Sequence, residues 1–156
     1  MSEVPSREPS PLIPVLAPFY DTMRDLSWPL LRFVVGGALL IHGIAKLLGP
    51  GVAAFAAGSL SRRGIEPAVP LAYVIFFLET IGAVCIVLGL FTRFFAAAVA
   101  IEMAVITFFV FYPNGYGFSS PGGGWEFPFI WGALFFIIAL RGGGPWSLDR
   151  LVGKEL

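Results

Sequence analysis

Four long apolar runs dominate this sequence and limit what it can fold into. The runs cover residues 29–48, 70–90, 94–112 and 125–140. Each is close to the ~20 residues that an α-helix needs to cross ~30 Å of hydrocarbon. None shows the period-two alternation of a transmembrane strand, and an open sheet leaves unpaired backbone groups in lipid. The sequence therefore predicts an all-α fold, a polytopic membrane four-helix bundle.

The composition is typical of a membrane protein and argues against nucleic-acid binding and disulfide redox chemistry. Hydrophobic residues make up 57% of the 156-residue chain, charged residues make up 13%, and the mean hydropathy is +0.84. A soluble domain of this size could not bury so much apolar surface. On folding, roughly a third of the surface that the unfolded chain exposes remains accessible to water. The formal net charge of zero argues against a nucleic acid partner. The single cysteine, Cys85, excludes an intrachain disulfide and a CxxC redox pair.

Three regions follow from the position of the runs. Residues 1–27 hold several prolines and charges and form a predicted proline-rich cytoplasmic tail. Residues 28–141 form the predicted four-helix transmembrane domain, and residues 142–156 form a cytoplasmic C-terminal tail. Within residues 51–70, charged side chains beside apolar ones predict a short interfacial helix between the first and second spans.

The lysine and arginine residues predict the orientation. With four spans, Arg62 and Arg63 fall on one side of the membrane with Lys46. The other side collects more basic residues: Arg7, Arg24, Arg93, Arg141, Arg150 and Lys154. The positive-inside rule then places both termini in the cytoplasm. We therefore expect a multi-pass protein of the cytoplasmic membrane, in contact with membrane lipids.

Ionisable residues inside the spans are the candidate site residues. Each costs roughly 2.5–3.5 kcal/mol at the centre of a membrane helix, so each needs a partner or a function. The candidates are Arg32, His42, Lys46, Glu79, Glu102 and Glu126. His42 and Lys46 are four residues apart and share a helix face, and Arg32 projects within about 80° of both.

Two interpretations of these residues remain open. They can be structural locks, in which basic groups of the first span pair with carboxylates of the second and third. Alternatively, His42, Lys46, Glu79 and Glu126 can line a polar pocket in the outer half of the bundle. His42 and Glu79 lie at similar depths, ~9 and ~13 Å from the outer ends of their helices. A quinone headgroup suits such a pocket, because each carbonyl needs a donor and the protons need a route.

Other site types lack their residues. One histidine cannot form a bis-histidine haem site, and no Glu-x-x-His pair or zinc-ligand spacing occurs in the sequence. The sequence therefore predicts no metal site, and it assigns no catalytic residue.

Several short motifs occur in a particular order along the chain. They are Arg32, G-x-x-x-x-x-H-G-x-x-K-L at 36–47, F-F-L-E-T-I-G at 76–82, G-L-F-T-R at 89–93, Glu102, G-G-W-E at 123–126 and G-P-W-S-L-D at 144–149. Over residues 29–149 this order resembles the DoxX family of small four-helix membrane proteins, which is related to the DoxD subunit of thiosulfate:quinone oxidoreductase. The family's polar positions correspond here to Arg32, His42, Lys46, Glu79, Arg93 and Glu126, with no agreed catalytic role.

The resemblance implies a quinone-interacting or oxidoreductase-associated subunit of the cytoplasmic membrane. Some members of the family act as membrane partners of soluble oxidoreductases, so such a partner is expected here. The alternative is a non-catalytic scaffold, or a protein that binds a small ligand, whose buried charges are structural. A homo-oligomer stays open.

Overall fold

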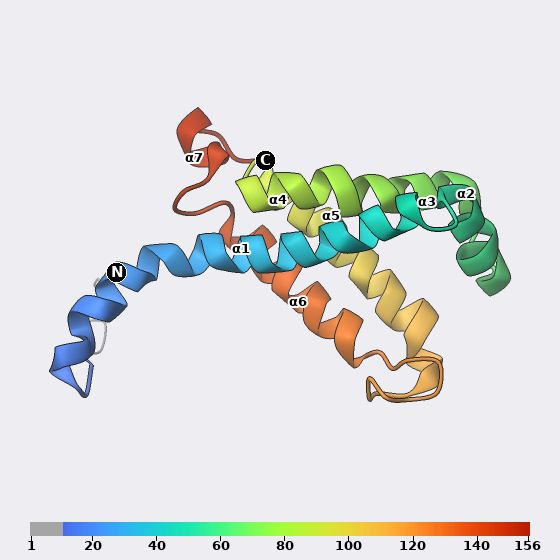
Figure 1. Ribbon diagram of the computed structural model, residues 1–156, viewed down its shortest axis with the longest axis horizontal. Helices are drawn as coiled ribbons and strands as arrows, with labels where there is room; N and C mark the ends of the chain where they lie inside the picture. The colour runs from blue at the N-terminus through green and yellow to red at the C-terminus, as the bar shows by residue number, and fades with distance from the viewer. Residues whose placement is uncertain (1–10) are drawn as a thin grey trace, which may run out of the picture.

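The computed structural model describes residues 11–156, and this part of the chain contains helices and no strand (Figure 1). Three helical stretches are long and apolar enough to cross a membrane: Pro14–Leu48, Ala68–Leu88 and Thr92–Asn114. The prediction of a helical membrane protein is confirmed. Residues 1–10 of the predicted tail lie outside the described residues.

The first long helix, α1 (Ala17–Leu48), begins before the apolar run that predicted it. Pro18 lies in its first turn, where a proline costs no hydrogen bond because the missing N–H would have no partner. Pro29, the first residue of that apolar run, lies inside the helix. The N-terminal part of α1 extends beyond the other helices in Figure 1.

The second long helix consists of α3 (Ala68–Phe77), a π-helical turn η4 (Leu78–Gly82) and α4 (Ala83–Leu88). It ends at Gly89, whose φ of 70° lies in the left-handed region that glycine adopts readily. The chain then reverses within three residues into α5 (Thr92–Val105). This short connection makes the second and third helices an antiparallel hairpin.

A helical segment joins α1 to α3 where the sequence predicted a short interfacial helix. It consists of α2 (Val52–Phe55), η2 (Ala56–Leu60) and η3 (Ser61–Arg63). Its buried side chains pack against Ala68 and Ala72 of α3 and form a small second core. Its location at a membrane surface stays a prediction.

The fourth helix is α6 (Glu126–Arg141), which packs along α5. Its 16 residues give a length of ~24 Å, shorter than the other three stretches, of which the third continues from α5 through η5 (Ile106–Phe111) and η6 (Tyr112–Asn114). A last short helix, α7 (Leu148–Val152), is followed by residues 153–156. The main core contains fully buried side chains from four helices: Leu39, Ile86, Val99, Phe135 and Ile138.

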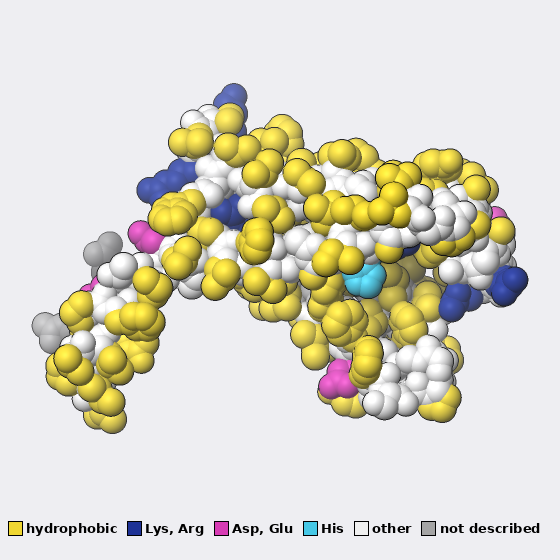
Figure 2. Space-filling view, in the orientation of Figure 1, with side chains coloured by type: hydrophobic (Ala, Val, Ile, Leu, Met, Phe, Trp, Pro, Cys, Tyr) yellow, Lys and Arg dark blue, Asp and Glu magenta, His cyan; other side chains and the backbone are white. Residues whose placement is uncertain are grey.

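The surface is mainly apolar, as lipid contact requires. In Figure 2 hydrophobic side chains cover most of the visible face, and the Lys and Arg side chains gather towards the ends of the molecule. Figure 1 shows α5 and α6 side by side, with their ends near the 115–125 loop angled away from α1.

Candidate ligand pocket and buried charges

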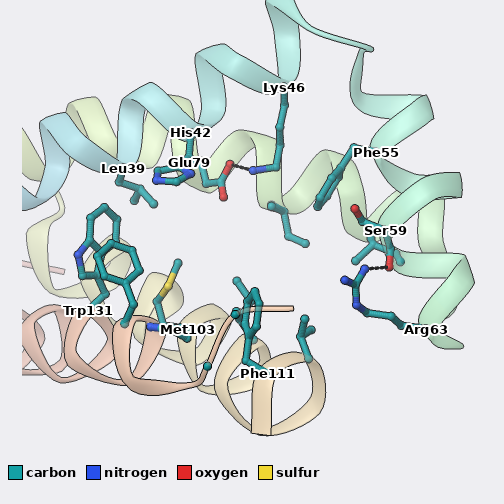
Figure 3. Close-up of a pocket in the computed structure, with 18 of the residues that line it drawn as sticks. Leu39, His42, Lys46, Phe55, Ser59, Arg63, Glu79, Met103, Phe111 and Trp131 are labelled. Carbon is teal, nitrogen blue, oxygen red and sulfur yellow. Dashed lines mark hydrogen bonds and ion pairs between the residues drawn. The ribbon is translucent and has the colours of Figure 1, made fainter. Parts of the chain in front are cut away.

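A cavity of about 410 Å³ lies between α1, the η2–η3 segment, the second long helix and the α5–α6 pair (Figure 3). Its volume falls within the ~300–1,000 Å³ of small-molecule sites. Most of its wall is aromatic or aliphatic. The aromatic side chains are Phe55, Phe111, Phe118, Phe127 and Trp131.

A lysine–glutamate ion pair forms part of the wall. Lys46 of α1 extends to the carboxylate of Glu79 on η4, and Figure 3 shows the two side chains meeting at the pocket. Their side chains are only 15% and 5% exposed. The ammonium group of Lys46 also lies 4.8 Å from the ring centroid of Phe55, at cation–π distance. The pair agrees with both interpretations of the sequence, because it joins a basic group of the first span to a carboxylate of the second and also forms part of the pocket wall.

Gly43 brings α1 close enough for the pair to form. A Cβ atom at this position would lie 2.6 Å from Cγ2 of Thr80 and 2.7 Å from the backbone oxygen of Glu79. The π-helical turn η4 widens the helix here, and the Thr80 hydroxyl donates to the Phe76 carbonyl at 2.6 Å. Such turns are frequent at functional sites.

His42 lies one turn before Lys46 and also lines the pocket. Its imidazole ring meets Trp131 of α6 edge to face, with ring centroids 5.8 Å apart. This contact connects the first and fourth helices across the cavity, as Figure 3 shows. The ring nitrogens of His42 can donate to or accept from a ligand in the pocket.

Glu102 of α5 lies beside the ion pair, and its residue is 7% exposed. It interacts electrostatically with Glu79 and Lys46. Both of its carboxyl oxygens are buried and lack a hydrogen-bond partner among the described residues. The structure thus brings together four of the six candidate residues: His42, Lys46, Glu79 and Glu102.

Arg32 lies elsewhere, at the end of the bundle near the Gly89 turn. It is 1% exposed and donates to four backbone carbonyls. The acceptors are the carbonyls of Ile86 (3.3 Å), Val87 (3.1 Å), Pro145 (3.3 Å) and Trp146 (2.9 Å). Arg32 therefore joins α1 to the end of α4 and to the C-terminal segment, and it does not share a site with His42 and Lys46.

The C-terminal segment packs back onto the bundle through Asp149, which is 1% exposed. Its carboxylate accepts from the backbone N–H of Phe91 (2.7 Å) and Thr92 (2.9 Å) and from the Thr92 hydroxyl (2.6 Å). These bonds satisfy free N–H groups at the start of α5, as a helix cap does. Asp149 also interacts electrostatically with Arg32.

Glu126, the sixth candidate, holds the loop before α6 and is absent from the pocket wall. Its carboxylate accepts from the Tyr116 hydroxyl at 3.3 Å and the Phe118 N–H at 3.2 Å. The structure therefore separates Glu126 from the ion pair with which it was grouped.

The sequence analysis did not predict that Glu79 and Glu102 lie close together, although their distances from the turn at residues 89–91 indicate it. Glu79 stands ten residues before Gly89, and Glu102 stands eleven residues after Phe91. In a tight antiparallel hairpin these positions fall at equal height. Arg63, whose guanidinium donates to the Ser59 carbonyl at 2.7 Å, also lines the pocket and was not a candidate.

The fold and the pocket together define a small helical membrane protein with a buried polar cluster beside an apolar cavity. The chain belongs to the DoxX family, which matches residues 27–112. This finding confirms the resemblance inferred from the motifs.

A relative from Haemophilus influenzae is 32% identical over 138 residues, covering 86% of this chain and 97% of the relative. That relative is described as an uncharacterized protein. No solved structure matches the chain. No group of three or more His, Cys, Asp or Glu side chains that could hold a metal ion occurs within residues 11–156.

Proposed function

We propose that this DoxX-family protein binds a quinone in the pocket beside Lys46 and Glu79, as the membrane subunit of an oxidoreductase. One observation carries the proposal: a cavity of about 410 Å³ combines an aromatic wall with a buried lysine–glutamate pair and a histidine. Small-molecule sites have this make-up, a mostly apolar lining with a few placed polar groups.

The residues of the pocket fit the chemistry of a quinone. The flat ring can pack against Phe55 and Trp131, since aromatic side chains favour stacked or edge-to-face contacts. The carbonyl oxygens need donors, and both the Lys46 ammonium and the His42 ring can donate. An isoprenoid tail would contact the apolar remainder of the cavity. By the family resemblance, the electrons come from a soluble oxidoreductase partner.

The proposal includes an arrangement in the membrane. α6 forms the fourth membrane-crossing segment, with both termini in the cytoplasm and the domain bounded at residues 28 and 141. The α2–η3 segment then lies at the outer surface, where Arg62 and Arg63 are exposed. In this arrangement the pocket lies in the outer half of the bundle.

A thermal-unfolding experiment tests the proposal. Adding a short-chain quinone to the purified protein is expected to stabilise it, by about 2.7 kcal/mol at a ligand concentration of one hundred times Kd. The ligand-induced rise in Tm is expected to disappear in His42→Ala and Glu79→Gln and to persist in Arg62→Ala, whose side chain lies outside the pocket.

The comparison uses the ligand-induced change in Tm for each protein, because removal of one member of a buried ion pair itself destabilises by about 3–5 kcal/mol. An equal rise in all the variants would mean that quinone binds elsewhere. If the wild-type protein shows no rise, the buried charges are structural locks, and the alternative of a scaffold protein holds.

A further inference from the structure

Glu79 and Glu102 lie together in the core of the bundle, and within residues 11–156 the basic group paired with them is Lys46. The two residues are 4% and 7% exposed. Lys46 pairs with Glu79, while both oxygens of Glu102 have no hydrogen-bond partner in the described part of the chain. Two carboxylates and one ammonium group would leave a net negative charge in an apolar environment.

Such an uncompensated charge is costly, since transfer of an unpaired carboxylate out of water requires far more energy than transfer of a neutral group. Two deprotonated carboxylates cannot hydrogen-bond to each other, because both only accept. A proton on one of the two carboxyl groups turns that group into a donor, and Glu79 is the carboxylate that interacts with Glu102. One shared proton therefore removes the net charge and supplies the missing partner.

The other ionisable groups around the pocket have positions or partners of their own. Arg63 of η3, which also lines the pocket, donates to the Ser59 carbonyl at 2.7 Å. From α1 the groups that face the pair are Lys46 and, one turn away, His42. The ionisable side chains of α6, Glu126 and Arg141, stand at its two ends. On α5 the remaining ionisable side chain is Arg93, which donates to backbone carbonyls at the end of α6 and to Glu155.

We propose that Glu79 and Glu102 form a carboxyl pair that shares one proton, and that binding of a ligand in the pocket requires this proton. The second part rests on the proposed function. With the proton present, Lys46, Glu79 and Glu102 together are neutral. Loss of the proton leaves a negative charge at the pocket wall, which repels the partially negative carbonyl oxygens of a quinone. Ligand affinity therefore falls at a pH high enough to remove the proton.

Infrared spectroscopy tests the carboxyl pair without any ligand. The wild-type protein at neutral pH is expected to show the C=O stretching band of a protonated carboxylic acid, shifted in D₂O. The isosteric Glu102→Gln variant is expected to lack this band, and Glu126→Gln, which alters a carboxylate in the loop, is expected to keep it. A wild-type spectrum without the band, or a band that Glu102→Gln retains, would overturn the pair.

Binding of a short-chain quinone at several pH values tests the second part. Over the pH range in which the proton is lost, wild-type affinity is expected to fall by up to about tenfold per pH unit, as proton linkage requires. Glu102→Gln keeps the group neutral at every pH, so its affinity is expected to stay within about twofold over the same range. Wild-type binding that does not change with pH overturns the linkage. Absence of binding at every pH refutes the proposed function, and the infrared result still decides the carboxyl pair.

Discussion

Replacing Arg32 with alanine is expected to destabilise the folded protein by about 3–5 kcal/mol, because a fully buried charged group and its hydrogen bonds are lost. The four backbone carbonyls that accept from Arg32 come from the end of α4 and from residues 145–146. Without the guanidinium they lose their donors, and the C-terminal segment loses its attachment to α1. Equilibrium unfolding in mixed micelles measures the change.

Two further variants separate the role of Arg32 from a general effect of charge removal. Arg32→Lys keeps the charge but lacks the planar set of donors that reaches four carbonyls, so an intermediate loss is expected. Arg150→Ala removes an exposed arginine of α7 and is expected to change stability by at most about 0.5 kcal/mol. An Arg32→Ala protein as stable as wild type would contradict the structural role given to this residue.

Gly43→Ala is the second substitution with a large expected effect. The new Cβ atom would lie 2.7 Å from the backbone oxygen of Glu79, which cannot move away as a side chain can. The helices must therefore separate, at a cost of about 1–3 kcal/mol. Separation also weakens the contact between Lys46 and Glu79, so the quinone-induced rise in Tm is expected to be lost as well.

Gly37→Ala is the matched control, because it adds the same methyl group to the same helix. A Cβ atom at Gly37 would meet nothing within 4 Å. Thermal unfolding with and without quinone is expected to match wild type for this variant. If Gly43→Ala also behaves as wild type on both readouts, close approach of α1 and η4 does not control the pocket.

The apolar runs predicted the helices well, since lipid requires every spanning segment to be a helix of nearly fixed length. The start of α1 at Ala17 was less accessible to prediction. Pro18 fits a first turn, whereas the apolar run that predicted this helix begins only at Pro29, which lies within the helix. A proline is compatible with both positions, and tertiary context decides between them.

For the buried charges, too, contacts that depend on tertiary structure could not be predicted from the sequence. Lys46 and Glu79 could be associated from helix face and depth, because regular helices fix both quantities. The partners of Arg32 could not, since they are backbone carbonyls and carry no sequence signal. Asp149 acts on residues 91–92 only because the chain after α6 folds back onto the bundle, which a polar tail of this composition does not indicate.

Small-molecule mass spectrometry of the purified protein tests the central claim, that the pocket beside Lys46 and Glu79 holds a quinone. After purification from membranes in mild detergent, the wild-type protein is expected to carry close to one quinone per chain. The double variant Lys46→Met/Glu79→Gln removes the ion pair together, so no single charge is left unpaired, and it is expected to carry almost none. Equal amounts in the two proteins, or none in the wild type, would contradict the claim.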